Sequence, residues 1–543
     1  MVFARRSTTL LAAIIASCAM VLSLTACTSD NKTVVDGQTT VTSNSAGGVA
    51  VFTPSDGITL NQQVPLNKWA KLVPDLTKAL VDAGFKKGDI NHTTSDSLDK
   101  QSRAIQDFVV DHLSNNTTDD SGIAIAPDNM TLLVAPVVEA DASTRQYGDY
   151  VSQNLSTNDV TDGEATSDGE SSEDDSSKDD SSNTESDSTA SDEQAQAVDR
   201  LVSSLKLAKE SGMHVVLLGN SIEGYKPDAF VKFSDAQTIG KLQAEKMVSK
   251  LKLDKASKDN PKYIEVLLPY TAVDEKGNVN DSTFAQEAFR GIWQVLGSYY
   301  QKGVVESPSG TLDGKSTEND WQAVAYDAAK EGSTAKVLDK RLAKTDGQST
   351  LTRIDGIITM NDYIASEVVK ELDDLGYTGS AADINPQITI SGIVGNITGK
   401  KDLSRDAVPD PIKSPENDNA NDSSSSDDDA DEDTSASDKD RDSQWPLVTG
   451  YGAYVSNIPS IVNGKQWMTG MEDRQTIATD IAQACAKLNK DEALNSMPSI
   501  RNSEVGGVKK IPTISEPLLA VSASNLKSAL IDPGYISLAD AGL

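Results

Sequence analysis

Several short polar sequences directly follow apolar runs of this chain, and their side chains could bind a small polar ligand. They are Thr53-Pro54-Ser55-Asp56, Ala135-Pro136, Gly219-Asn220, Pro269-Tyr270, Asn361-Asp362 and Gly392-Ile393-Val394. The carboxamide of Asn361 and the carboxylate of Asp362 donate and accept the hydrogen bonds that hold a polar solute. Each sequence taken alone is also typical of a turn, because Gly, Asn, Asp and Pro are common in loops.

Motifs for catalysis are missing from the sequence. The only histidines, His92, His112 and His214, do not have the spacing of a triad or a metal site. Residues 219–224 (GNSIEG) have the second glycine one position too late for a nucleophile elbow, and 395–401 (GNITGKK) lack two residues of a phosphate loop. No spacing singles out an acid–base pair of carboxylates. The sequence therefore predicts a binding protein and not an enzyme, with no catalytic residue, metal or cofactor.

Apolar strands separated by helical patterns are expected to position these loops. The predicted strands are 48–52, 131–135, 214–218, 263–268, 354–360 and 388–391, and the predicted helices are 72–83, 100–113, 201–208, 285–296 and 364–375. Strands without polar alternation, each followed by a helix, indicate parallel sheets covered on both faces. Their number exceeds one sheet, so the predicted fold is α/β with two doubly wound lobes, and ligands are expected beyond the carboxyl ends of the strands.

The N-terminus has the pattern of an export signal. Arg5 and Arg6 precede an apolar run over 10–24, which is too short to span a bilayer comfortably. The run ends in Leu24-Thr25-Ala26-Cys27, which resembles the bacterial lipobox. This resemblance implies cleavage of residues 1–26 and acylation of Cys27, and the alternative is an ordinary signal peptide. We expect an exported chain anchored by lipid to the outer face of the cytoplasmic membrane, with 27–46 as a tether.

Charge and cysteine content narrow the classes further. The net charge of −33 over 543 residues argues against a nucleic-acid partner. Two acidic segments, 157–194 and 402–443, are nearly free of apolar residues, and we predict disordered insertions there. Calcium binding by 427–433 is an alternative that lacks the glycine and spacing of a known loop. Once Cys18 leaves with the signal and Cys27 is acylated, only Cys485 remains, so no internal disulfide is expected.

The order of motifs resembles the xylose-binding and multiple-sugar-binding proteins of bacterial ABC importers. It is carried by LKLAKESGMHVVLLGNSI, FVKFSDAQTIGKLQAEKMV, IDGIITMNDYIASEVVKEL, ITISGIVG, GKQWMTGMEDRQTIATDIA and the tail GVKKIPTISEPLLAVSASNLKSALIDPGYIS. The resemblance implies a type I periplasmic-binding-protein fold, a monomer whose lobes close on a sugar and dock on a membrane permease. It places three crossings near Gly219, Met471 and Ile514, so that lobe I is 47–219 plus 472–513 and lobe II is 220–471 plus 514–543.

The expected pocket departs from the family in half of its residues. Gly219-Asn220 replace an Asp-Arg pair, Gly392-Ile393-Val394 replace Gly-Gln-Asp, and Glu472 replaces a lysine. Asn361-Asp362 are retained, and Trp69 and Trp321 fall at the positions of cleft tryptophans, although both could equally be structural. The predicted ligand-binding residues are Asn361, Asp362, Trp69, Trp321, Asn220, Asp56 and Glu472.

Two hypotheses follow. The first is a lipid-anchored solute-binding protein of an ABC importer that captures a monosaccharide or related polar solute by hinge closure. The second is a surface lipoprotein with a degenerate pocket that acts as a sensor or protein-interaction module. The retained Asn361-Asp362 pair favours the first, and the substitutions at Ile393, Val394 and Glu472 favour the second.

Overall fold

The structure, a computed structural model, describes residues 34–35, 38–39, 46–55, 65–115, 125–138, 144–151, 153–156, 185–273, 281–343, 351–382 and 444–543. Compact packing divides the chain into 1–45 and 46–543. In the first unit the described part is an antiparallel pair, β1 (Val34–Val35) with β2 (Gln38–Thr39). Cys27, Asp56, the strand predicted at 388–391, Ile393, Val394 and the second acidic insertion lie outside the described residues.

Lobe I is built on a seven-stranded sheet in the order β17-β18-β9-β7-β5-β3-β4. All neighbouring strands are parallel except the pair β17 and β18, which is antiparallel. The strands are β3 (Gly48–Pro54), β4 (Ile90–Ser95), β5 (Met130–Val134), β7 (His214–Leu218), β9 (Ala229–Lys232), β17 (Ile500–Val505) and β18 (Val508–Ser515). The same lobe contains a short parallel pair, β6 (Asn154–Leu155) with β8 (Ser221–Ile222).

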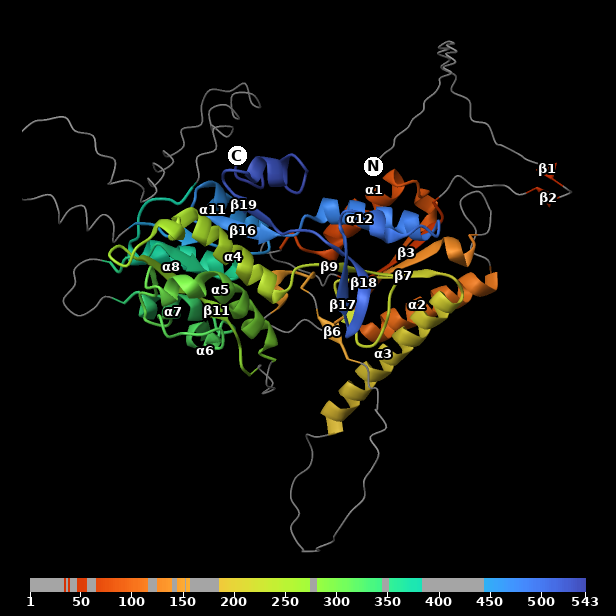
Figure 1. Ribbon diagram of the computed structural model, residues 1–543, viewed down its shortest axis with the longest axis horizontal. Coiled ribbons are helices and arrows are strands. Elements are labelled where there is room, and N and C mark those ends of the chain that lie inside the picture. Colours follow the sequence, from red (N-terminus) through yellow and green to blue (C-terminus); the bar gives the residue numbers. More distant parts are fainter. Residues whose placement is uncertain are drawn as a thin grey trace, which may run out of the picture. The chain divides into compact units, whose positions relative to one another are not determined.

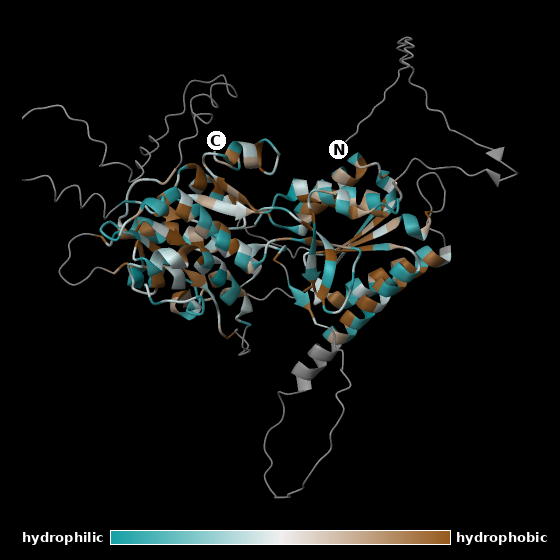
Figure 2. Ribbon diagram, viewed as in Figure 1, coloured by the Kyte–Doolittle hydropathy of each residue, from teal (hydrophilic) through white to brown (hydrophobic). Residues whose placement is uncertain are grey.

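Alternate residues of these strands enter two different cores. Val49 and Val51 pack with α1 (Trp69–Asp82) and α12 (Arg474–Leu488). Ala50 and Phe52 pack with α2 (Leu98–Asn115) and α3 (Glu185–Glu210). Helices α1 and α12 are neighbours, as are α2 and α3 (Figure 1). The central strands are therefore apolar on both faces, as Figure 2 shows by their brown colour, because helices cover each face of the sheet.

Lobe II has a parallel sheet in the order β12-β10-β14-β15. Its strands are β10 (Lys262–Val266), β12 (Val305–Glu306), β14 (Gly356–Ile358) and β15 (Leu447–Val448), with the pairs β11 (Leu268–Pro269) with β13 (Ala325–Tyr326) and β16 (Met468–Met471) with β19 (Leu519–Ser522). Its helices are α4 (Ala236–Leu251), α5 (Thr283–Gln301), α6 (Trp321–Val324), α7 (Ser333–Arg341), α8 (Asp362–Leu375) and α11 (Ile458–Val462). One large core joins the sheet to α4, α5 and α8.

The prediction of an α/β fold with two doubly wound lobes and three crossings is confirmed. The chain passes between the lobes at 472–473, between β16 and α12, and at 516–518, between β18 and β19. The first crossing was predicted near Gly219. Strand β9 pairs with β7 in lobe I, so the chain leaves this lobe after Lys232 and not near Gly219.

Two further features bear on the predictions. Helix α3 begins at Glu185, inside the acidic segment 157–194 that we predicted to be disordered, so the last part of that segment is helical. Within the described ranges, no helix has both the length and the apolar character needed to cross a bilayer.

Candidate functional site

The retained pair Asn361-Asp362 lies where the sequence placed it, between the end of β14 and the start of α8. Asn361 is the N-cap of α8, and its Oδ1 accepts a hydrogen bond from the Ile364 amide at 2.9 Å. Its Nδ2 donates to Oε1 of Gln146, a lobe I residue, at 3.1 Å. Asn361 is fully buried. The carboxamide that we expected to meet a solute therefore meets a side chain of the other lobe.

Asp362 is fully buried and connects the loop between β15 and α11 with the chain from Gln466 into β16. Its Oδ1 accepts from Gln466 Nε2 at 2.7 Å, and its Oδ2 accepts from the Tyr454 amide and the Thr469 hydroxyl, both at 2.9 Å. Burial raises the pKa of Asp362 to about 6, although these three donors oppose the rise. Gly450 permits this packing, because a Cβ there would lie 2.1 Å from Asp362 Oδ1.

Glu472 connects two of the crossings between the lobes. It stands at the 472–473 crossing, and its Oε1 accepts from the Ser234 amide at 2.6 Å, where the chain first leaves lobe I. The Ser234 hydroxyl also contacts the hydroxyl of Tyr451. Burial raises the pKa of Glu472 to about 7, and hydrogen bonds from Ser234 and Tyr451 oppose that rise. Glu472 is therefore an internal carboxyl at the hinge.

Trp69 belongs to an aromatic cluster of lobe I. Its ring lies 5.1 Å from that of Tyr150 and 5.7 Å from that of Phe233, edge to face in both cases. Only 2% of Trp69 is exposed. Gly219 faces it, since a Cβ there would lie 3.7 Å from the indole. The structure thus places Gly219 against the aromatic cluster, at a position where the proteins that the sequence resembles have a charged residue.

Asn220 and Trp321 do not join this group. Asn220 ties loops of lobe I together, because its Nδ2 donates to Pro136 O at 2.9 Å and its Oδ1 accepts from the Gln153 amide at 3.0 Å. Trp321 begins α6, is half-buried, and packs edge to face on Tyr270 at 5.1 Å. Tyr270 follows β11, one of the strand ends singled out by sequence.

The structure adds residues that the sequence did not indicate. Gln146, Ser234 and Tyr451 each contact a predicted site residue, although Gln146 lies 215 positions from Asn361 and Ser234 lies 238 positions from Glu472. Gln146 comes from a stretch without periodicity that precedes the first acidic insertion. Only its nearness to the predicted strand 131–135 could have suggested a place beside the site.

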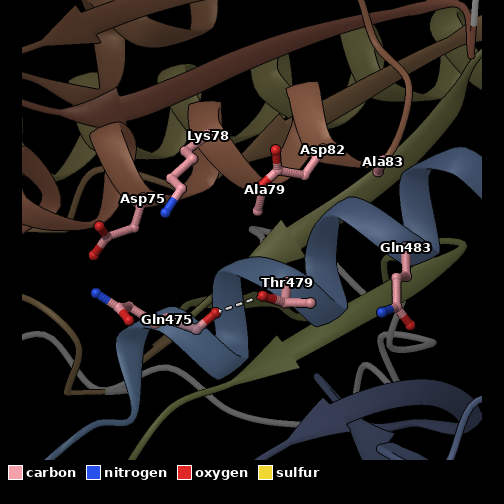
Figure 3. Close-up of a pocket in the computed structure, with 8 residues that line it drawn as sticks. All are labelled: Asp75, Lys78, Ala79, Asp82, Ala83, Gln475, Thr479 and Gln483. Carbon is pink, nitrogen blue, oxygen red and sulfur yellow. Dashed lines mark hydrogen bonds between the residues drawn. The ribbon is translucent and has the colours of Figure 1, made fainter. Parts of the chain in front are cut away.

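A separate surface pocket with a volume of about 370 Å³ lies in lobe I (Figure 3). Asp75, Lys78, Ala79, Asp82 and Ala83 of α1 and its C-cap line one side, and Gln475, Thr479 and Gln483 of α12 line the other. The Arg474 guanidinium pairs with Asp75 at 2.5 Å beside it. None of the residues predicted from sequence lies in this pocket.

No protein-family model and no curated protein sequence matches the chain. Solved structures do. A Clostridium phytofermentans ABC transporter solute-binding protein with bound β-D-glucose is 16% identical, with 91% of this chain and 99% of that chain covered and a TM-score of 0.44. A Chloroflexus aurantiacus carbohydrate transporter solute-binding protein with D-glucose is 17% identical, with coverages of 92% and 98% and a TM-score of 0.43.

A periplasmic ribose ABC transporter protein from Conexibacter woesei is 13% identical, with coverages of 90% and 96% and a TM-score of 0.42. At these identities and TM-scores, no ligand and no residue role is transferred to this chain.

Proposed function

We propose that this chain is the extracytoplasmic solute-binding protein of an ABC importer, and that it captures a monosaccharide or a related small polar solute between its lobes. The observation that carries the proposal is the position of Asn361, Asp362 and Glu472, which lie at or beside the crossings between two doubly wound lobes. Closure of such lobes about their crossings buries polar groups from both sides around a ligand. The motif order in the sequence supports the same role.

Asn361 would carry the recognition of a hydroxyl group. Its Oδ1 is held by the helix cap, so its Nδ2 has a fixed direction toward lobe I. The carboxamide oxygen of Gln146, which it now contacts, is an acceptor like the oxygen of a sugar hydroxyl. The aromatic cluster of Trp69, Tyr150 and Phe233, with each residue at most 2% exposed, would offer an apolar face to a sugar ring only once the lobes open. The proposed role is binding, with no chemical step.

A thermal-shift screen tests this function. The mature chain with Cys27→Ser is scanned against pentoses, hexoses, their acids and polyols at millimolar concentration. We expect one class to raise the melting temperature, since a ligand at about 100 times its Kd adds roughly 2.7 kcal/mol of stability. Asn361→Ser keeps a capping oxygen but removes the carboxamide donor, so the rise should disappear. Asn319→Ala, at an exposed position of lobe II, should keep it.

The anchoring part of the proposal is tested separately. We expect the full chain to enter the detergent phase in Triton X-114 partition after expression in a bacterium that acylates lipoproteins, since acyl chains carry a soluble domain into micelles. Cys27→Ala should move it to the aqueous phase. An unchanged partition would refute acylation at Cys27.

The second candidate is a surface lipoprotein whose pocket no longer takes a solute. It is favoured by one observation, namely that Trp69, Asn220, Asp362 and Glu472 are buried and contact groups of their own chain. A flat thermal-shift profile for the wild type, and also for a Gln146→Ala variant that frees the Asn361 carboxamide, would favour this candidate.

A further inference from the structure

Residues 144–151 connect the two lobes, and we call them the bridging segment. On lobe I, the amide of Asp149 donates to Asn67 O at 2.8 Å, and its carboxylate accepts from Lys68 Nζ at 2.6 Å and from the Trp69 amide at 3.1 Å. The Tyr150 hydroxyl donates to Lys68 O at 2.5 Å. These bonds fix the second half of the segment to the beginning of α1.

Gly148 permits this attachment. Its φ of +97° lies in the region that glycine adopts most readily, and a Cβ there would lie 2.6 Å from Asn67 O. The Asn67 carboxamide is buried, and its Nδ2 has no hydrogen-bond partner in the described residues, while its Oδ1 accepts from the Glu472 amide at 3.4 Å. Asn67 therefore contacts both the segment and the backbone of Glu472.

The first half of the segment contacts lobe II. Gln146 Oε1 accepts from Asn361 Nδ2 at 3.1 Å, and the Gln146 backbone oxygen accepts from the Tyr454 hydroxyl at 2.6 Å. The Tyr147 ring lies 4.7 Å from Phe284 and 6.3 Å from Tyr451, and only 1% of Tyr147 is exposed. Tyr147 and Val151 pack in the core of lobe II, although their segment follows a strand of lobe I.

We propose that the bridging segment occupies the site between the lobes as an internal ligand, and that it holds them together until a solute displaces it. This inference rests on the proposed function, because it concerns the same Asn361. The Gln146 carboxamide accepts the hydrogen bond from Asn361 that a solute hydroxyl would accept. The ring of Tyr147 occupies the aromatic contact with Phe284, and the ring of Tyr150 occupies that with Trp69. Binding of solute and docking of Gln146 and Tyr147 are then mutually exclusive.

Such competition lowers the apparent affinity for solute, because only the fraction of molecules with a released segment can bind.

Distance measurements between spin labels test the proposal. Labels are placed at Glu210→Cys on α3 of lobe I and Lys370→Cys on α8 of lobe II, both exposed. The chain is the mature protein with Cys27→Ser, in which the remaining Cys485 is fully buried. The bridging variants are Gln146→Ala and Gln146→Ala/Tyr147→Ala. The control is Tyr225→Ala, which truncates a buried tyrosine in the lobe I core that packs against α2 and α3.

We expect one narrow distance distribution for the wild type and the control, and a broader distribution reaching longer distances for the bridging variants. In the bridging variants, a solute that binds should narrow the distance distribution again. Its apparent Kd for these variants should be at least tenfold lower than its Kd for the wild type. Cooperative melting of each variant checks folding, and Gln146→Ala decides if the double variant does not fold.

The outcomes separate the two proposals. Equal distributions for the wild type, control and bridging variants would overturn the internal-ligand proposal, as would a broad distribution in the wild type. Broad distributions in the bridging variants alone, with no sugar, sugar acid or polyol narrowing them, would keep the internal ligand and refute capture of such solutes.

Discussion

Lobe II and the hinge contain buried carboxylates in two different settings. Glu265, in β10 of the lobe II sheet, is fully buried and lies 3.5 Å from the guanidinium of Arg341, with further bonds from Ser307 and the Ser309 amide. Asp362 and Glu472 are equally buried, but the donors recorded for them are amides, a carboxamide and hydroxyls. No ion pair involves either of them in the part of the chain that the structure describes.

Glu265 belongs to the scaffold, whereas Asp362 and Glu472 can respond to changes in pH, ligand or lobe position. Glu265 is paired with a cation, so its contribution is structural. Burial raises the pKa of Asp362 to about 6 and that of Glu472 to about 7, and only neutral donors oppose the rise, so a proton, a solute or a movement of the lobes changes their energy at modest cost. Glu472 lies at a crossing, and Asp362 accepts a hydrogen bond from Thr469 in β16, the strand that leads to that crossing.

Removing the cation tests the structural half of this comparison. Arg341→Met should lower the free energy of unfolding by about 3 to 5 kcal/mol, because it leaves a buried carboxylate uncompensated. Arg341 also donates to Val266 O and Val324 O, which adds to the loss. Urea unfolding at pH 7 measures it. Glu265→Gln/Arg341→Met should recover part of the stability, and a double variant no better than Arg341→Met would contradict the charge explanation.

A pH series tests the sensitive half. Burial raises the pKa of Glu472 from 4.5 to about 7, so the folded chain keeps a proton that the unfolded chain releases. The stability contributed by Glu472 is therefore full below pH 4.5 and is lost as the pH rises to about 7. Glu472→Gln should match the wild type at pH 4 and exceed it at pH 8 by roughly 3 kcal/mol. Parallel stability curves would show that Glu472 titrates normally.

Gly148→Ala should have a smaller effect on the free energy of unfolding, because it acts on the bridging segment alone. A side chain at φ +97° and so close to Asn67 should cost about 1 to 3 kcal/mol if the segment stays docked. Release of the segment would limit the cost. We expect chemical denaturation to show the loss, and Gly224→Ala, at φ +70° with open space around it, controls for the backbone strain.

The sequence predicted the strands and helices with strong apolar patterns and missed weaker ones. Strand β7 was predicted with the bounds that the structure has, and β3 and β5 within two residues. Strand β4 was missed because its sequence, INHTTS, is polar and lies at the edge of the sheet. Strand β9 was missed because four residues carry too little pattern, and the first crossing was misplaced with it.

The places of Asn361 and Asp362 in the fold were predicted from sequence, and their partners were not. Asn361 and Asp362 were found because they follow a buried strand and precede a helix, which are local signals. Their partners Gln146, Tyr454 and Gln466 lie up to 215 positions away, and no local pattern encodes such contacts. The ligand-binding roles predicted for all seven residues and the acylation predicted for Cys27 stay predictions.

Hydrogen exchange in the unliganded mature chain directly tests whether the bridging segment is docked on both lobes. A segment docked on both lobes should exchange slowly, since the Asp149 amide donates to Asn67 O and the Tyr147 amide donates to Thr144 O. We predict protection of 144–151 in the wild type and in Tyr225→Ala, with at least tenfold faster exchange in Asn361→Ser. Exchange of 144–151 at the rate of a free peptide in the wild type would contradict the account.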